Sequence, residues 1–319
     1  MARKSSFYYH DDCKQLAAFL LGLGLVVSAI NPSVSAERAL RSTAVTQLLA
    51  TSRFERYRQW TDLMQAIYLR EHQKVAKQIS IGADVNYTLP GMDTPLRLAL
   101  NVEDVRVAEM LLHAGANPDV GDDMGSTPLM QAVKGRNLKL VSALLRAKAN
   151  VNAISNTHDS PILIAAEVGN PEILELLLRY GANHSVRNSR GQDSLWVAVE
   201  HKRASIVPIL LRKNIDSPRH DQSGRSLMTL AAENGDSETI RLLARYGFSV
   251  NTVDRRGRSP LKAALFQSGL SSVLTLFELG ADLRKLTQSD LTTIRGRAEA
   301  IPNISPEFMA QLVKLIDVS

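Results

Sequence analysis

Small and apolar residues recur along most of the chain at a fixed interval of 33 positions. The interval is clearest for alanine, which occupies seven positions in register without an insertion: Ala66, Ala99, Ala132, Ala165, Ala198, Ala231 and Ala264. Each alanine lies in a short apolar segment, and a second apolar segment follows before the next alanine. A repeat of this length is typical of stacked supersecondary units. The pattern therefore predicts two short helices per unit, with the small alanine allowing close helix packing.

The start of the first helix in each unit is marked by a small or polar residue that lies five positions before the alanine. These residues are Thr61, Thr94, Thr127, Ser160, Asp193, Ser226 and Ser259. Such side chains accept hydrogen bonds from backbone N–H groups at a helix start. Proline follows four of them, at Pro95, Pro128, Pro161 and Pro260. Proline is favourable at the first helical position because its missing N–H has no partner there.

The second helix of each unit carries adjacent aliphatic residues that are expected to face inward: Leu111-Leu112, Leu144-Leu145, Leu177-Leu178, Leu210-Leu211 and Leu242-Leu243. Glycine then ends five of these helices, at Gly82, Gly115, Gly181, Gly247 and Gly280. A left-handed residue closes a helix, and glycine adopts that conformation without strain. Asn214 tolerates the same conformation, whereas Lys148 predicts a strained or loosened turn.

The two ends of the array depart from the regular pattern. Residues 37–60 are expected to form an N-terminal capping helix, whose apolar side contains Val45, Leu48 and Leu49. Residues 285–319 are expected to form a degenerate C-terminal cap. There Thr292 falls in register as a helix start, Arg297 occupies the alanine position, and a final helix begins at 305–307. Terminal repeats of this kind shield the core from water.

Three segments have the motif T-P-L or S-P-L followed by alanine: DTPLRLAL (93–100), STPLMQAV (126–133) and RSPLKAAL (258–265). With the 33-residue period they resemble the ankyrin repeat, whose signature is T-P-L-H-x-A. The resemblance covers residues 61–284, with units starting near 61, 94, 127, 160, 193, 226 and 259. It implies an all-α solenoid of helix-turn-helix units linked by turn or β-hairpin tips, and a protein-binding function. Histidine is absent from the fourth motif position, which holds Met64, Arg97, Met130, Leu163, Trp196, Thr229 and Lys262.

The first 36 residues have the pattern of an export signal. Arg3, Lys4 and Lys14 lie close to an apolar run at 16–30, and small residues lead up to Ala36. We expect cleavage after Ala36, which would remove the only cysteine of the chain. The mature protein would then contain neither disulfides nor thiol chemistry, as suits an oxidising compartment.

An alternative interpretation makes residues 16–30 an uncleaved membrane anchor, although a helical span needs about 20 apolar residues. Asp11 and Asp12 also depart from a typical signal. In either case we expect the rest of the chain to be exported, periplasmic or secreted, and monomeric. The short signal and the compact array suggest a bacterial source.

No arrangement of residues in the sequence indicates catalysis, a metal or another cofactor. The chain of 319 residues has ordinary soluble composition, with 45% hydrophobic and 22% charged residues and a formal net charge of +6. Its seven histidines are scattered and never lie three or four residues apart on one predicted helix. The doublet Asp122-Asp123 alone cannot supply the six or more oxygens that calcium prefers. The sequence thus predicts a non-enzymatic protein.

The charges of the predicted tips are sorted along the array. Residues 86–93, 119–126 and 153–159 contain five acidic residues and no lysine or arginine, whereas 186–192, 219–225 and 252–258 contain seven arginines and two aspartates. The tips therefore sum to −5 in the first half and +5 in the second. Such a field would orient an oppositely polarised partner.

The predicted partner-binding residues lie on these tips and the adjoining groove: Asp122, Asp123, Met124, Asp159, Arg187, Arg190, Arg219, Arg225, Arg255, Arg256, Arg258 and Phe266. Phe266 falls at a position that faces the groove in such folds, while Trp196 is expected to pack in the core. An alternative function is binding of nucleic acid or another anionic polymer by the arginine tips. The acidic half and the lack of exposed aromatic residues among the arginines argue against it.

Overall fold

The computed structural model describes residues 61–88, 94–213, 220–221, 224–267, 270–300 and 304–317. The chain divides into two compact units, Met1–Gln65 and Ala66–Ser319. The predicted export signal and N-terminal capping helix lie outside the described residues, as does the expected helix end at Asn214. None of the helices in the described part of the chain is long and apolar enough to cross a membrane.

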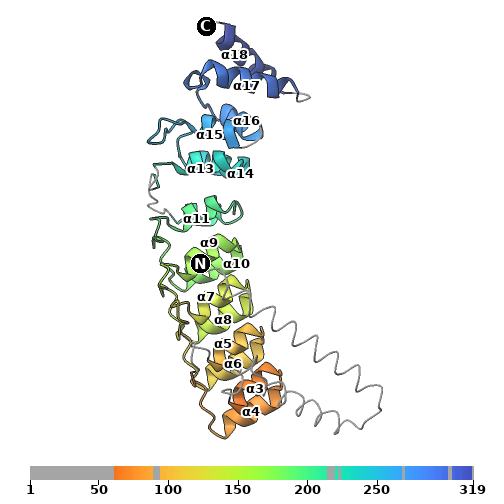
Figure 1. The fold of residues 1–319 in the computed structure, drawn as a ribbon, viewed down its shortest axis with the longest axis vertical. Helices are drawn as coiled ribbons and strands as arrows, with labels where there is room; N and C mark the ends of the chain where they lie inside the picture. Colours follow the sequence, from red (N-terminus) through yellow and green to blue (C-terminus); the bar gives the residue numbers. More distant parts are fainter. Residues whose placement is uncertain are drawn as a thin grey trace, which may run out of the picture. The chain divides into compact units, whose positions relative to one another are not determined.

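The described residues form helices in pairs and no strand, which confirms the all-α class (Figure 1). The first helices of the pairs are α3 (Asp62–Tyr68), α5 (Pro95–Asn101), α7 (Pro128–Lys134), α9 (Pro161–Val168), α11 (Ser194–Glu200), α13 (Leu227–Asn234) and α15 (Pro260–Gln267). The second helices are α4 (His72–Ser80), α6 (Val105–His113), α8 (Leu138–Arg146), α10 (Pro171–Arg179), α12 (Val207–Leu211), α14 (Ser237–Arg245) and α16 (Leu270–Glu278).

Each predicted cap residue of the first helices accepts the expected backbone hydrogen bond. Thr94 accepts from the N–H of Arg97 at 3.2 Å, and Asp193 accepts from the N–H of Trp196 at 3.0 Å. Thr61, Thr127, Ser160, Ser226 and Ser259 do the same. Proline is the first residue of α5, α7, α9 and α15. The sequence pattern therefore located every first-helix start correctly.

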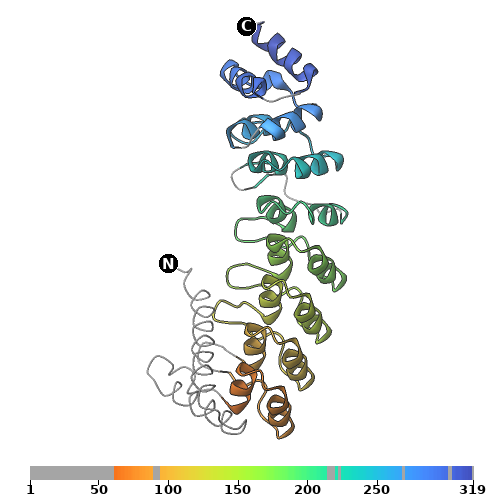
Figure 2. The same cartoon turned by 90° about the vertical axis from the view of Figure 1, so that its right-hand side faces the viewer.

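Helices of the same kind pack on one another from pair to pair, so that two helical layers form within residues 66–319 (Figure 2). In the first layer α5, α7, α9, α11, α13 and α15 contact one another in sequence order. The seven alanines of the 33-residue pattern are at most 3% exposed. Because they lie where helices approach closely, a larger side chain there would overpack the interior. The loops project on the side of the first layer (Figure 2).

The paired aliphatic residues of the second helices do not all face inward. Leu111, Leu177 and Leu243 are fully buried, whereas Leu112, Leu178 and Leu242 are half-buried. Consecutive helical residues diverge by about 100° around the axis, so both can face the core only where neighbours cover a wide arc. Leu144-Leu145 and Leu210-Leu211 satisfy that condition and are buried.

The turn at Lys148 is strained but not loosened. Lys148 has a φ of +63°, in the left-handed region where Gly115 and Gly181 have +90° and +85°. The closing hydrogen bonds are nevertheless formed, from the N–H of Lys148 to Leu145 at 3.0 Å and from that of Ala149 to Leu144 at 3.0 Å. The expected strain is therefore present, and the turn is closed in the same way as at the glycines.

The fifth helix pair is irregular because its second helix, α12, lacks the capping side chain that several other second helices have. The residues before α6, α8, α10 and α14 are Asp104, Asn137, Asn170 and Asp236, and each side chain caps the helix that follows. Arg203 stands at the same register position and cannot accept a hydrogen bond. It donates to the carbonyl of Glu167 instead, and α12 begins only at Val207 with no side-chain cap.

The C-terminal end breaks the repeat register. After the 3-10 helix η2 (Leu283–Lys285), α17 (Gln288–Glu299) begins earlier than the predicted start at Thr292. Thr287 caps it in a reciprocal capping box with Asp290, which satisfies two backbone donors at once. A last helix, α18 (Pro306–Asp317), then buries Phe308 edge-on against Phe277 of α16, with ring centroids 4.9 Å apart. The predicted inner leucines Leu312 and Leu315 have side chains outside the described part.

Candidate functional site

Five loops between successive units share one hydrogen-bonded turn, and we call them the tip loops: 122–126, 155–159, 188–192, 221–225 and 254–258. In each, the N–H of the first residue donates to the carbonyl of the fifth, at 2.9 to 3.1 Å. The first side chain also folds back onto its own turn. In the last tip loop Asp254 accepts from the N–H groups of Arg256 and Arg258 at 2.9 and 2.8 Å. The expected hairpin-like tips are thus present without a regular strand in the described residues.

The residue at the first tip position is always one whose side chain can accept hydrogen bonds. Asp122, Ser155, Asn188, Asp221 and Asp254 stand there, at intervals of 33. Asp122 accepts from the N–H groups of Met124 and Ser126 at 3.0 and 2.8 Å. Asp122 was predicted to bind a partner, and the structure gives it a second task, the ordering of its own loop. The recurring Asp, Asn or Ser was visible in the sequence and would have signalled this.

Successive tip loops also contact one another through the backbone. The N–H of Asn156 donates to the carbonyl of Met124 at 2.9 Å, and that of Arg255 donates to Gly224 at 3.3 Å. Gly224 has a φ of +80°, and a Cβ placed on it would lie 2.2 Å from Cγ of Arg255. The stem of Arg255 therefore lies flat against a glycine that no other residue could replace without a shift.

A further ladder of side chains joins neighbouring units just before the tip loops. Asn152 accepts from the N–H of Asn183 at 2.8 Å and donates to the carbonyl of Gly181 at 3.1 Å. Asn86, Asp119 and Asn251 make the corresponding bond to the next unit. Asp119, which was counted among the acidic tip charges, therefore also holds two units in register.

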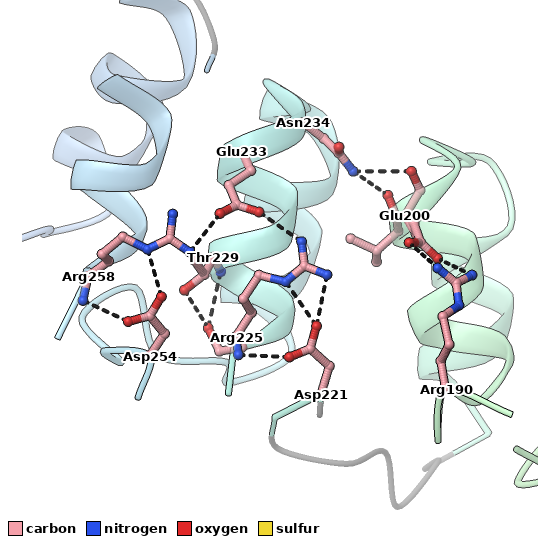
Figure 3. A network of polar contacts seen from close by, with 11 residues as sticks. Arg190, Glu200, Asp221, Arg225, Thr229, Glu233, Asn234, Asp254 and Arg258 are labelled. Atoms are coloured by element: carbon pink, nitrogen blue, oxygen red, sulfur yellow. Dashed lines mark hydrogen bonds and ion pairs between the residues drawn. The ribbon is translucent and has the colours of Figure 1, made fainter. Parts of the chain in front are cut away.

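The arginines at the ends of the last two tip loops are bound within the chain (Figure 3). Arg225 pairs with Asp221 at 2.8 Å and with Glu233 at 3.1 Å. Arg258 pairs with Asp254 at 2.8 Å and with the other oxygen of Glu233 at 3.1 Å. Glu233, on α13, thus bridges two tip loops with a side chain that is only 12% exposed. Ion pairs this sheltered hold their geometry better than exposed pairs do.

The electrostatics of this network stabilise its charged forms. Burial by itself would raise the pKa of Asp254. The hydrogen bonds from the backbone and guanidinium of Arg258 and from the N–H of Arg256 outweigh burial and hold that pKa below its usual value. Burial likewise opposes the charge on Arg225, but Asp221 and Glu233 raise the pKa of Arg225 overall. The charged forms of Asp254 and Arg225 are therefore both favoured in the folded protein.

The remaining contacts of the first layer extend the network toward α11. Arg190 makes a bidentate pair with Glu200 at 2.8 and 2.9 Å, although its side chain stays 57% exposed. Asn234, which follows Glu233, donates to the carbonyl of Val199 at 2.7 Å (Figure 3). These contacts link α11 to α13, and Glu233 continues the link from α13 to the tip loop before α15.

On the acidic side, Asp122 is neutralised by a cation that the sequence count of the tips omitted. Arg97 of α5 donates to Asp122 at 3.1 Å and to the carbonyl of Ser126 at 2.8 Å. Asp123 and Asp159 are exposed, and Asp159 accepts from the hydroxyl of Thr157 at 2.8 Å. The net values of −5 and +5 therefore overstate the field, because Arg97, Glu200 and Glu233 belong to the same surface.

Three predicted arginines remain exposed without an ion pair in the part of the chain that the structure describes: Arg187, Arg255 and Arg256. Arg219 lies outside the described residues. Met124 and Phe266 are 51% and 67% exposed, whereas Trp196 is fully buried and belongs to the core as expected. The predicted set thus divides into side chains that build the tips and side chains that the tips present.

In the described part of the chain, no group of three or more His, Cys, Asp or Glu side chains could hold a metal ion. His72 does contact a carboxylate, at 2.6 Å from Asp104. Asp104 also caps α6, and although burial pushes its pKa up, the bonds from His72 and from the N–H of Val107 lower it overall. This contact joins α4 to the start of α6 and is structural.

Stacked helix pairs joined by uniform tip loops define a helical repeat protein. The family model for ankyrin repeats in three copies matches residues 63–155, 96–188, 138–221 and 195–286. Because these matches together span more than half of the chain, the protein belongs to the ankyrin repeat family. Ankyrin repeats typically mediate protein–protein interaction.

Solved structures agree with this assignment. The ankyrin repeat domain of human ASB11 is similar with a TM-score of 0.61 and 26% identity, over 70% of this chain and 99% of that domain. The ankyrin repeat domain of Bcl-3, a member of the IkappaB protein family, has a TM-score of 0.60 and 23% identity, over 69% and 99%. The second likeness concerns the fold alone. A comparison with curated proteins finds none that matches this chain.

Proposed function

We propose that this protein is a non-enzymatic scaffold of seven ankyrin repeats over residues 61–284, which binds a protein partner through its groove and tip loops. One observation carries the proposal. The described tip loops share one hydrogen-bonded turn, yet their third position varies between methionine, threonine and arginine, at Met124, Thr157, Arg190 and Arg256. A fixed frame with varied exposed residues suits recognition because little conformational entropy is lost on binding.

Within this proposal the predicted residues have two roles. The presented side chains, which would contact the partner, are Asp123, Met124, Asp159, Arg187, Arg190, Arg255, Arg256 and Phe266. Asp122, Arg225 and Arg258 hold the loops that present them, and Arg219 stays a prediction. Residues 285–319 serve as the C-terminal cap, and the protein acts as a monomer.

The proposed site of action is outside the cytoplasm, in the periplasm or the medium. The basis is the predicted export signal at 1–36, with residues 16–30 as the alternative anchor and a bacterial source. The mass of the mature protein tests the proposal, because cleavage after Ala36 leaves Glu37 as the first residue.

Site-specific photocrosslinking tests the binding surface. A benzophenone side chain is placed at Met124, Arg256 or Phe266, and for comparison at Glu175 or Glu238, which are exposed on second helices. The proposal expects a discrete adduct in cells from the first set and none from the second. Adducts from the second-helix positions alone would contradict it.

Binding of nucleic acid by the arginine tips is the alternative function. The acidic partners of Arg225 and Arg258 weaken it, because those guanidinium groups are already occupied. This alternative requires measurable affinity for DNA or RNA at physiological salt, which falls steeply as salt rises.

A further inference from the structure

The last tip loop presents two arginines that its own ion-pair network leaves unused. Asp221, Glu233 and Asp254 carry three negative charges, against two positive charges on Arg225 and Arg258. The network is thus closed and slightly acidic. Arg255 and Arg256 stand outside it, exposed and without an ion pair in the described residues.

The position of Arg255 is fixed before any partner arrives. Its N–H is bound to the carbonyl of Gly224, and its stem lies against the α-carbon of that glycine. The neighbouring N–H of Arg256 is held by Asp254 at 2.9 Å. Two guanidinium groups on a held backbone are suited to carboxylates, which they can bind in a bidentate manner.

Two large apolar side chains flank these arginines in the sequence and are also exposed. Val253 immediately precedes the tip loop and is 45% exposed. Phe266 lies on α15, the helix into which the tip loop leads, and is 67% exposed. Phe266 occupies the register position of Glu200 and Glu233, whose side chains reach the tip arginines Arg190 and Arg225 of their own units. Aromatic residues and arginine are both enriched at protein interfaces. We call Val253, Arg255, Arg256 and Phe266 the C-terminal tip surface.

We propose that the C-terminal tip surface binds an acidic polypeptide segment that carries bulky apolar side chains. The inference rests on the proposed scaffold function and names the partner chemistry at one end of it. Carboxylates of the segment bind Arg255 and Arg256, and its apolar side chains contact Val253 and Phe266. A polyanion fits less well, because a nucleic acid gains affinity from many phosphate contacts while Glu233 and Asp254 lie beside the two free arginines.

Peptide binding to the full chain tests this proposal by fluorescence anisotropy. The probe is a labelled peptide of about ten residues that combines glutamates with two phenylalanines. One comparison peptide replaces glutamate by lysine, a second replaces phenylalanine by serine, and a labelled single-stranded DNA of similar length is the polyanion. We expect the acidic, phenylalanine-containing peptide to bind most tightly.

Charge reversal then locates the site. The double variant R255E/R256E is compared with R179E/R245E, which changes the net charge equally at exposed arginines on second helices. We expect R255E/R256E to weaken binding by about tenfold or more and R179E/R245E by less than about twofold. F266S should weaken the phenylalanine-containing peptide more than the serine-containing one. Thermal midpoints close to wild type for all variants show that folding is not the cause.

Several outcomes overturn the proposal. Equal weakening by both double variants would mean that net charge alone acts, and tighter binding of DNA would favour the polyanion. A concentration-dependent dimer that R255E/R256E abolishes would make the occupant a second copy. If only the lysine-containing peptide bound, and D123K abolished that binding, the proposal for the C-terminal tip surface would be rejected. The scaffold function would still stand.

Discussion

The first and last tip loops of the described array, 122–126 and 254–258, have the same backbone and opposite electrostatics. Both start with an aspartate that binds the third and fifth N–H groups of its own loop. At the first loop the neighbouring helix supplies the cation, Arg97, and the loop supplies the anion. At the last loop the helix supplies the anion, Glu233, and the loop supplies the cation, Arg258.

The comparison separates charges that build a loop from charges that the loop presents. In each loop one charged side chain folds back and pairs with an opposite charge on the preceding first helix: Asp122 with Arg97, and Arg258 with Glu233. These paired charges contribute little to the electrostatic field outside the loops. The second and third positions are unmatched, and they hold Asp123 and Met124 in one loop but Arg255 and Arg256 in the other. Polarity along the tips therefore depends on these presented positions.

The aspartates at the first tip position should give the largest loss of stability. Replacing Asp254 by alanine removes two backbone hydrogen bonds and one of the two carboxylate partners of Arg258, and should cost about 2–3 kcal/mol of unfolding free energy. D122A should cost a similar amount because its loop has the same bonds. Urea unfolding of both variants measures the loss of stability. A loss at only one loop would contradict the equal structural role of the first tip position in the two loops.

Asparagine at the same position is the matched control, since Asn188 already serves in another loop. D254N keeps the turn bonds and loses the charge, so it should cost less than D254A. The pKa of Asp254 is lowered in the folded state, so its charge stabilises the fold above the unfolded value of about 3.9. This advantage over D254N should shrink as the pH falls below about 4, through the folded pKa.

Removing the helix residue that pairs with each loop, Glu233 or Arg97, should cause a smaller loss of stability. E233A removes a negative charge, whereas R97A removes a positive one. E233A leaves Arg225 and Arg258 with one aspartate each, and R97A leaves Asp122 with its backbone bonds alone. Each variant should lose about 1–2 kcal/mol, because the pairs are sheltered but not fully buried. Adding R258A to E233A should cost less than the sum of the two single changes. Strict additivity would mean that the bridge contributes nothing.

The sequence predicted the repeat and the first-helix starts because those features depend on local chemistry at fixed spacing. Thr94 and Pro95 mark a helix start through local chemistry, because the threonine side chain caps the helix and proline suits its first position. The late start of α12 was also readable, because Arg203 stands where a capping Asp or Asn occurs in other units. The 33-residue register predicts the wrong start for α17 because the repeat ends before it, although Thr287 and Asp290 have the spacing of a capping box.

The pairing of the tip arginines could not be predicted in the same way. Arg256 and Arg258 are alike in the sequence, and only the fold brings Glu233 to one of them from the preceding helix. By contrast, the repeat register predicted correctly that Trp196 packs in the core, and it placed the exposed Phe266 at an outward-facing position. Side-chain direction at a loop depends on the whole stack, which a local pattern does not contain.

The smallest effect on stability is expected at the fourth tip position. This residue is glycine in the loops 122–126 and 254–258 and histidine in the loop 155–159. Gly125 and Gly257 adopt φ values of +71° and +73°, while His158 is held at +62° in the same role. A side chain in the left-handed region costs about 1 kcal/mol, part of which glycine returns as entropy of the unfolded chain. H158G should therefore stabilise the protein by about 0.5 kcal/mol.

The reciprocal change isolates the backbone term. A Cβ on Gly257 would meet no atom within 4 Å, so G257A should destabilise through its φ alone, by about 1 kcal/mol. Chemical denaturation of the two variants against wild type gives both values. If H158G destabilised the protein, the exposed imidazole would be making a contact that outweighs its strain, and the loop 155–159 would not be equivalent to the other two. If both signs are as expected, one backbone frame underlies the acidic and the basic tips, and their difference lies in the side chains that the frame presents.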